Sequence, residues 1–155
     1  MSHYLNIETQ ITDQDALIRA LNRMEYKGGV SLGKVKIESH ITAQNLYGYH
    51  GDMRQDKAQV IIRRNYVGPS SNDIGFIKNA KGNFQAIISE YDRNSLNYND
   101  QWVAKLGTYY GVEKMKMECE SKGQKYFEDT DEKNRPRFRM PISGAYGAGG
   151  GAYAT

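Results

Sequence analysis

The sequence predicts an α+β fold in which an antiparallel sheet carries two or three helices on one face, in a ferredoxin-like arrangement. The strongest observation is a pair of alternating apolar runs, residues 74–78 and 83–90, which flank a short Asn-Ala-Lys-Gly turn and predict a β-hairpin. Residues 5–11 also alternate as a strand, and helical spacing follows them. A second helical pattern begins at Asn99, so strands and helices share one chain with a sheet at its centre.

The first helix is expected directly after the first strand. Thr12 is the expected N-cap, because acidic residues follow it in the first turn. Apolar residues recur at helical spacing from Leu17 to Met24, and the glycine pair at 28–29 supplies a stop. Alternation then predicts strands over residues 35–41 and 58–62, while the turn-rich segment 45–52 between them is expected to be a surface loop.

In the central hairpin, Gly82 suits the left-handed position that closes the turn, and Phe76 is predicted to be buried. The helix that starts after Asn99 carries an approximate apolar stripe, although Gly107 and Gly111 weaken it and predict a kink or a break near Gly111. Residues 125–129 and 137–142 are expected to form a last hairpin around a charged turn. We assign residues 1–142 to one domain and the Gly- and Tyr-rich residues 143–155 to a C-terminal tail.

Composition excludes several classes of protein. In 155 residues there is no run of about 18 apolar residues, so the sequence predicts no membrane insertion. The first residues lack the charged, apolar and small-residue regions that follow one another in a secretory signal. The one cysteine, Cys119, suits a reducing compartment, so we expect a cytoplasmic location. The net charge of +3 is too small to indicate a nucleic-acid partner by itself.

Several segments together resemble a known family. They are the opening Met-Ser-His-Tyr, the first strand and helix, the Asp-Ile-Gly-Phe-Ile-Lys-Asn-Ala-Lys-Gly-Asn-Phe hairpin at 73–84, and the tryptophan-bearing helix with the closing strand. Over most of residues 1–142 the chain resembles the hypothetical chloroplast reading frame thirty-five family of plastids, cyanobacteria and some of their phages. The resemblance implies an α+β fold and a role around the accumulation of photosystem I, in cyanobacterial cytoplasm or plastid stroma, or in the infected host cell if the protein is phage-encoded. It implies no catalytic residue.

A basic segment near the C-terminus is the first candidate for a binding surface. Lys133, Arg135, Arg137 and Arg139 alternate, so an extended segment 133–140 would place four cations on one face at intervals of about 6.6 Å. That spacing could follow a phosphate backbone. The alternative is a solvated sheet edge, which the neighbouring acidic run at 128–132 would partly neutralise. We favour the solvated edge.

A Tyr-rich loop is the second candidate. Tyr47, Tyr49 and His50 lie in a glycine-flanked segment that could be the tip of a partner-binding loop, because tyrosine presents a large contact area at low entropic cost. Ordinary packing of the loop is the competing interpretation. No histidine or cysteine stands at the spacing of metal ligands, and no base is identifiable beside a nucleophile, so we expect no metal, no cofactor and no enzymatic activity.

The sequence thus favours a non-enzymatic accessory or interaction protein, with one or more protein partners, in a photosynthetic context. The first alternative is nucleic-acid binding through strand 133–139. The second is a phage structural or host-takeover protein, for which the tail would be a docking arm.

Overall fold

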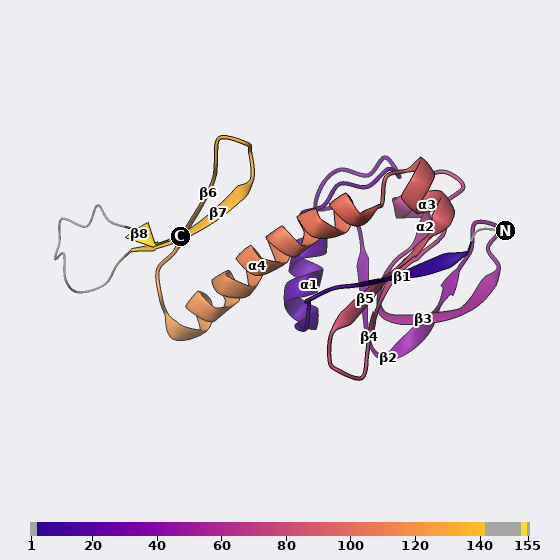
Figure 1. Cartoon of the computed structure of the whole chain (residues 1–155), viewed down its shortest axis with the longest axis horizontal. Helices are drawn as coiled ribbons and strands as arrows, with labels where there is room; N and C mark the ends of the chain where they lie inside the picture. Colours follow the sequence, from indigo (N-terminus) through magenta and orange to yellow (C-terminus); the bar gives the residue numbers. More distant parts are fainter. Residues whose placement is uncertain (1–2, 142–152, 155) are drawn as a thin grey trace.

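The fold was analysed in a computed structural model, which describes residues 3–141 and 153–154 (Figure 1). The remaining residues, which include most of the tail assigned to 143–155, lie outside the described part. The elements follow one another as β1 (Tyr4–Glu8), α1 (Gln14–Leu21), β2 (Ile37–Tyr47), β3 (Met53–Ile62), α2 (Arg64–Val67), β4 (Ile74–Lys78), β5 (Phe84–Ser89), α3 (Glu90–Ser95), α4 (Asp100–Lys122), β6 (Phe127–Thr130), β7 (Pro136–Pro141) and β8 (Tyr153–Ala154).

Five of the strands form one antiparallel sheet in the order β1-β5-β4-β3-β2. The α+β class and the antiparallel sheet are therefore confirmed. The ferredoxin-like arrangement is wrong, because that topology interleaves two crossover helices with its strands. Here β2 to β5 follow one another as a meander, and only α1 carries the chain from one edge of the sheet to the other.

The central hairpin matches its prediction. Phe76 lies opposite Ala86 in the antiparallel pair of β4 and β5, and its side chain is fully buried. Gly82 closes the turn with φ of 86°, a left-handed conformation that glycine adopts without strain. Alternate residues of β5 face opposite sides of the sheet, so Ile88 joins the main core while Ile87 joins a smaller cluster on the other side.

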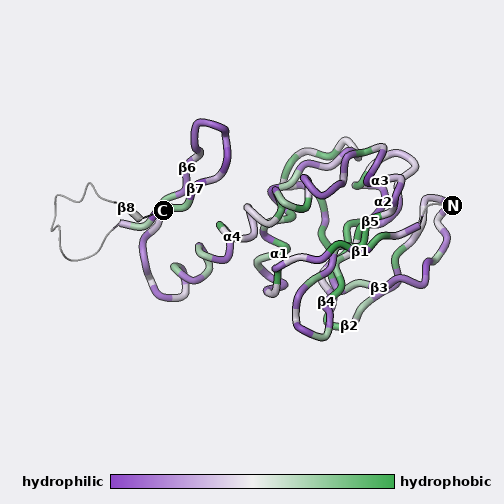
Figure 2. Tube along the Cα trace, viewed as in Figure 1, coloured by the Kyte–Doolittle hydropathy of each residue, from purple (hydrophilic) through white to green (hydrophobic). Residues whose placement is uncertain are grey.

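The main core lies between the sheet and a layer formed by α1 and α4 (Figure 2). Leu17 and Leu21 of α1 and Leu106 of α4 are fully buried against the inner face of the sheet. The helix α1 begins one residue later than expected, because Asp13 and not Thr12 is its N-cap, accepting a 3.0 Å hydrogen bond from the amide of Ala16.

The glycines that were expected to end the first helix and to break α4 have other roles. The helix α1 ends at Leu21, well before Gly28. A Cβ atom at Gly28 would lie 2.4 Å from the carbonyl oxygens of Asn65 and Tyr66, so this glycine allows two backbone segments to approach closely. The expected break in α4 is absent, since the helix runs unbroken through Gly107 and Gly111 to a left-handed C-cap at Gly123.

The hairpin of β2 and β3 covers part of the second face of the sheet. Between Ser39 and Gln44 the register shifts, and beyond this bulge Leu46 packs with Ala58 over Gly75. The segment 45–52, expected as a loop, is thus partly strand, and only its second half forms the turn. Burial of Leu46 explains the difference, because the side chain has neighbours that its local sequence does not reveal.

The last hairpin, β6 with β7, is confirmed and lies at the far end of α4 (Figure 1). One of its faces packs on the helix through Phe138, which joins Val112 and Cys119 in a small cluster. The ring of Tyr126 stacks on Phe138 with centroids 5.6 Å apart. The short strand β8 pairs with β7.

Candidate functional site

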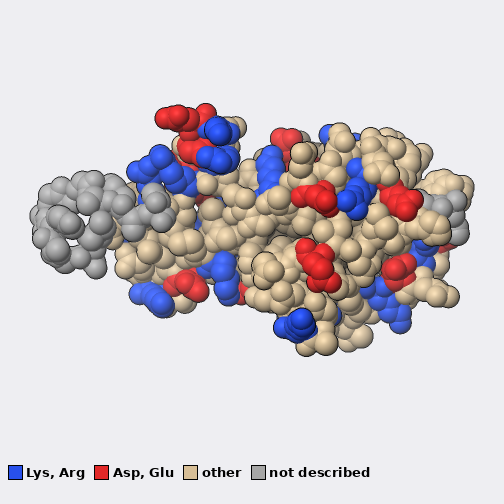
Figure 3. Space-filling model, in the orientation of Figure 1, with Lys and Arg blue, Asp and Glu red and all other residues tan. Residues whose placement is uncertain are grey.

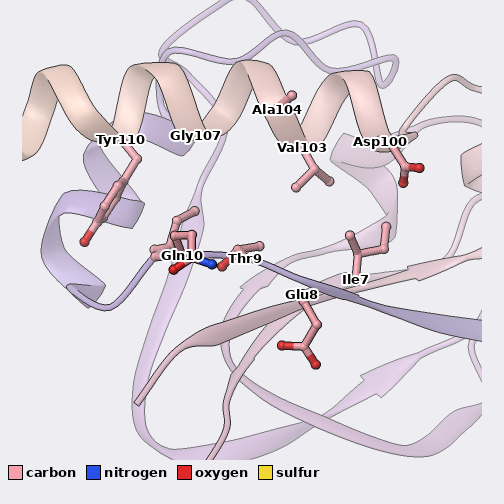
Figure 4. Close-up of a pocket in the computed structure, with 10 residues that line it drawn as sticks. Ile7, Glu8, Thr9, Gln10, Asp100, Val103, Ala104, Gly107 and Tyr110 are labelled. Atoms are coloured by element: carbon pink, nitrogen blue, oxygen red, sulfur yellow. Dashed lines mark hydrogen bonds between the residues drawn. The ribbon is translucent and has the colours of Figure 1, made fainter. Parts of the chain in front are cut away.

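A groove of about 430 Å³ separates the N-terminal half of α4 from the first strand and the segment that follows it (Figure 4). We call it the β1–α4 groove. It is lined by residues from both walls, which are Ile7, Glu8, Thr9, Gln10, Ile11, Asp100, Val103, Ala104, Gly107 and Tyr110. The groove brings together segments that lie about a hundred positions apart in the chain.

The helical wall follows from how α4 begins. Asn99 is its N-cap, and the side-chain oxygen accepts hydrogen bonds of 3.1 Å from the amides of Gln101 and Trp102. This start places positions 100, 103, 104, 107 and 110 on one face of the helix, at the spacing of neighbours on a helix surface. Because Gly107 has no side chain, the middle of this wall is bare backbone.

The opposite wall is the end of the edge strand β1 together with the segment that follows it. Five consecutive residues, 7–11, line it: Ile7 and Glu8 are the last residues of β1, and residues 9–11 continue the chain beyond the strand. Beyond β1, the hydroxyl of Thr9 donates to the carbonyl of Phe84 and holds the chain beside the sheet. The Tyr110 hydroxyl accepts hydrogen bonds from the amides of Thr12 and Asp13, at 3.2 and 3.0 Å, and closes one end of the groove.

The groove is apolar at its base and acidic where it carries charge. Ile11 and Val103 are buried below it. Of the described residues that line it, the charged ones are Glu8 and Asp100, and both are acidic. Glu8 accepts a hydrogen bond from the side chain of Gln85, and Asp100 pairs with Arg93 at 3.1 Å. The apolar base and the carboxylate of Glu8, whose described partner is neutral, suit binding of an apolar segment that carries a cation.

The Tyr-rich loop lies at another place on the molecule. Tyr47 ends β2, while the amide of Tyr49 in the following turn donates to the side chain of the buried Asn72 at 3.0 Å. The rings of Tyr49 and His50 contact each other, with centroids 3.8 Å apart. Tyr47 lines a hollow of about 370 Å³ together with Arg63, Arg64, Asn65 and Asp73, and neither Tyr49 nor His50 is among its described lining residues.

A buried carboxylate organises this second hollow. Asp73 is 1% exposed and accepts hydrogen bonds from the amides of Tyr47 and Arg64, both at 2.7 Å, and from the Arg63 guanidinium at 2.8 Å. Arg63 also pairs with Glu38 at 2.7 Å, and this hydrogen bond lowers the pKa of the Glu38 carboxyl. The described contacts of Arg63 and Asp73 thus fasten three strands together.

Sequence reasoning missed the arginine and carboxylate of this network. The signal that could have found them is the polar run Ser-Asn-Asp at 71–73 directly before a buried strand, since all three of these side chains prove to be buried. A buried polar run requires partners. Their identity depends on the register of β3 against β4, which sets Ile62 opposite Ile74.

The basic segment is shorter as a strand than expected. Arg137 and Arg139 lie in β7, but Lys133 and Arg135 lie in the turn before it, where Asn134 adopts a left-handed conformation with φ of 61°. The turn is stabilised by Asp131, whose side chain accepts hydrogen bonds from the amides of Lys133 and Arg135 at 2.9 Å. The expected extended segment 133–140 is therefore wrong over its first three residues.

Acidic side chains lie beside the arginines of the hairpin, as predicted. Arg137 forms two hydrogen bonds to Asp129, at 2.8 and 2.9 Å, and Arg139 lies 3.7 Å from the same carboxylate. Arg135 pairs with Asp131 at 2.7 Å. Hydrogen bonding from Arg137 lowers the pKa of Asp129. Figure 3 shows blue and red side chains intermixed at this end of the molecule.

Within residues 3–141 and 153–154, no three His, Cys, Asp or Glu side chains are grouped so that they could hold a metal ion. No helix in the same part of the chain has both the length and the apolar character for crossing a bilayer.

Comparison with known proteins gives one match. The model of a family described as protein of unknown function (DUF1257) matches residues 31–136, which include β2 to β6 with α4 but neither β1 nor α1. No curated protein and no solved structure gives a match. Since the matched residues make up more than half of the sequence, the chain belongs to the DUF1257 family.

Proposed function

We propose that this protein is a non-enzymatic interaction protein, which binds a segment of another protein in the β1–α4 groove. The observation that supports the proposal is a groove with an apolar base that adjoins the end of the edge strand β1. Ligand pockets are usually mostly apolar with a few placed polar groups, and this combination suits a peptide better than a small ion.

The cellular context of the proposal rests on resemblance. The hairpin at 73–84 resembles the hypothetical chloroplast reading frame thirty-five family, which supports a role around photosystem I accumulation in a photosynthetic cell or in a phage-infected host. We place the protein in the cyanobacterial cytoplasm or plastid stroma. Nucleic-acid binding is the weaker alternative, because three of the four basic residues proposed for it pair with Asp129 or Asp131.

The experiment uses two matched glycines of α4. A Cβ atom at either Gly107 or Gly111 would have no neighbour within 4 Å, so both positions accept a side chain, but only Gly107 is among the described groove residues. Tagged wild-type protein, Gly107→Trp and Gly111→Trp are each purified with cross-linking from the native cell.

The expected result is a protein partner that cross-links to wild type and to Gly111→Trp and is lost from Gly107→Trp. A partner retained by Gly107→Trp, or recovery of nucleic acid in place of protein, would contradict the proposal. Circular dichroism of the two variants checks that each keeps the helical content of wild type.

A further inference from the structure

The first strand is an edge of the sheet that is open for further pairing. Among the described strands β5 is its one neighbour, in continuous register from Tyr4 opposite Ser89 to Glu8 opposite Gln85. The amide of Glu90 donates to the carbonyl of His3 at 2.8 Å, which makes these two residues a hydrogen-bonded pair. Hydrogen-bonded and non-hydrogen-bonded pairs alternate along antiparallel strands, so the backbone groups of Tyr4, Asn6 and Glu8 point away from β5.

The two edges of the sheet differ in how they are protected. Sheet edges are usually protected from pairing with a further strand by bulges, prolines, lysines or a covering segment. At the opposite edge, β2 carries a bulge between Ser39 and Gln44, and the side chain of Gln14 donates to the carbonyl of His40 at 3.1 Å. By contrast, β1 has the sequence Tyr-Leu-Asn-Ile-Glu, with no lysine or proline, and no bulge interrupts its register with β5.

The groove adjoins the edge of the sheet at the C-terminal end of β1. Of β1, Ile7 and Glu8 line the groove, so a strand paired with β1 at the usual spacing of about 4.8 Å would meet the groove at these two residues and direct alternate side chains there towards α4. The helix offers Val103, Ala104 and Gly107 there, which are small or without a side chain (Figure 4). Apolar side chains of an added strand can therefore fill the groove.

The charge of the groove indicates what kind of segment fits. The charged residues of the described lining are Glu8 and Asp100, and Asp100 already pairs with Arg93. Glu8, which contacts the neutral side chain of Gln85, is therefore the carboxylate that a lysine or arginine would complement. A second copy of this chain paired through the same strand is less complementary, because Tyr4–Glu8 brings another glutamate and no cation. The groove thus favours a different protein over self-association.

We propose that the β1–α4 groove binds an extended segment of another protein as a sixth strand along β1, with alternating apolar residues towards α4 and a lysine or arginine near Glu8. This inference rests on the proposed function and adds to it the conformation and charge of the ligand. Strand addition draws its affinity from main-chain hydrogen bonds and its specificity from alternate side chains.

The probe is a displayed library of random dodecapeptides, selected on wild-type protein and counter-screened on Gly107→Trp and Gly111→Trp. We expect enriched peptides to alternate apolar residues and to carry Lys or Arg. Their affinity should fall by about tenfold or more on Gly107→Trp and stay within about twofold on Gly111→Trp. A library that yields no peptide sensitive to Gly107→Trp overturns both the inference and the proposed function.

A second measurement distinguishes failure of the strand-addition inference from failure of the proposed function. Each residue of one enriched peptide is N-methylated in turn, and binding is measured by fluorescence anisotropy. In an added strand only alternate amides face β1, so loss of binding should recur at every second residue. A peptide that is sensitive to Gly107→Trp but lacks this alternation, or that is acidic, overturns strand addition and leaves the groove as a binding site. A wild-type dimer in analytical ultracentrifugation that Gly107→Trp disperses would show a second copy as the occupant, and would also overturn the inference.

Discussion

Single side chains with several partners join parts of this molecule that are distant in sequence. Glu113, in the middle of α4, is 4% exposed and pairs with Arg19, Arg23 and Lys116. Burial acts to raise the pKa of Glu113, but hydrogen bonds from Arg23 and Lys116 outweigh it, so the pKa is lowered. Arg23 and Lys116 also pair with Glu128 of β6. These ion pairs join α1, α4 and the last hairpin.

Replacing Glu113 with Gln should lower the free energy of unfolding at pH 7 by about 1–3 kcal/mol, because the amide cannot match the charge of its partners. A folded-state pKa below the unfolded value makes the contribution of Glu113 fully present above about pH 4.5 and lost as the pH falls through the folded pKa. Urea unfolding at pH 7 and near pH 3.5 should therefore show that the difference in unfolding free energy between wild type and Glu113→Gln is smaller in acid. The exposed Glu118→Gln is the control, and an equal deficit at both pH values would contradict the prediction.

A larger loss is expected at Asp73, whose carboxylate has one charged and two backbone partners. In Asp73→Asn an NH2 group replaces one of the two carboxylate oxygens, so a donor faces the amide of either Tyr47 or Arg64, and Arg63 loses its buried counter-charge. We expect the free energy of unfolding to fall by about 3 kcal/mol, as when one partner of a buried ion pair is removed. Urea denaturation measures it, and a loss below about 1 kcal/mol would show that the network contributes little.

At the scale of whole elements, packing and not propensity decides where helices and strands run. The helix α4 contains two glycines, each of which costs up to about 1 kcal/mol relative to alanine. It nevertheless continues for 23 residues, because its N-cap, its buried residues and the last hairpin stabilise both halves. In β4, Gly75 has the opposite environment, since a Cβ there would lie 2.7 Å from Cβ of Ala58.

Replacing glycine with alanine is therefore expected to stabilise the protein in α4 and to destabilise it in β4. Gly107→Ala and Gly111→Ala should each raise the free energy of unfolding by about 0.5–1 kcal/mol, since the added methyl group meets open space in a helix. Gly75→Ala should lower it by about 1–3 kcal/mol, because Ala58 and Leu46 would have to move. Thermal unfolding of the three variants checks the signs, and a stabilising Gly75→Ala would contradict the packing described for this strand.

For the molecule as a whole, the distribution of charge matters more than its sum. The net charge is +3, but the cations of the last hairpin lie beside carboxylates (Figure 3). Pairing of this kind weakens the field that attracts a polyanion.

We therefore expect wild-type protein and Arg137→Ala to bind duplex DNA and single-stranded RNA equally weakly at physiological salt. A phosphate-binding strand would behave differently, with a log–log salt slope of roughly -0.7 to -0.9 per phosphate contacted, and Arg137→Ala would reduce it by about one unit. Fluorescence anisotropy over a salt series measures the slope. Sub-micromolar binding that Arg137→Ala weakens would place nucleic-acid binding ahead of the proposed function.

Features set by neighbours along the chain could be predicted from the sequence. The hairpin of β4 and β5, the turn at Gly82 and the N-cap Asn99 each depend on residues within a few positions of one another. Alternation and capping report such local preferences directly. The acidic neighbours of the basic segment were predicted for the same reason, because a short hairpin places 128–132 beside 135–139.

Only the tertiary structure decided the strand order, the network around Asp73 and the β1–α4 groove. Each depends on which distant segments meet, as when residues 7–11 line the same groove as positions 100–110 of α4. No local sequence pattern specifies such a long-range contact, because strand register and packing depend on which side chains the whole core buries. The free edge of β1 likewise follows from the strand order, since the same five residues in the middle of the sheet would have no backbone group left to pair.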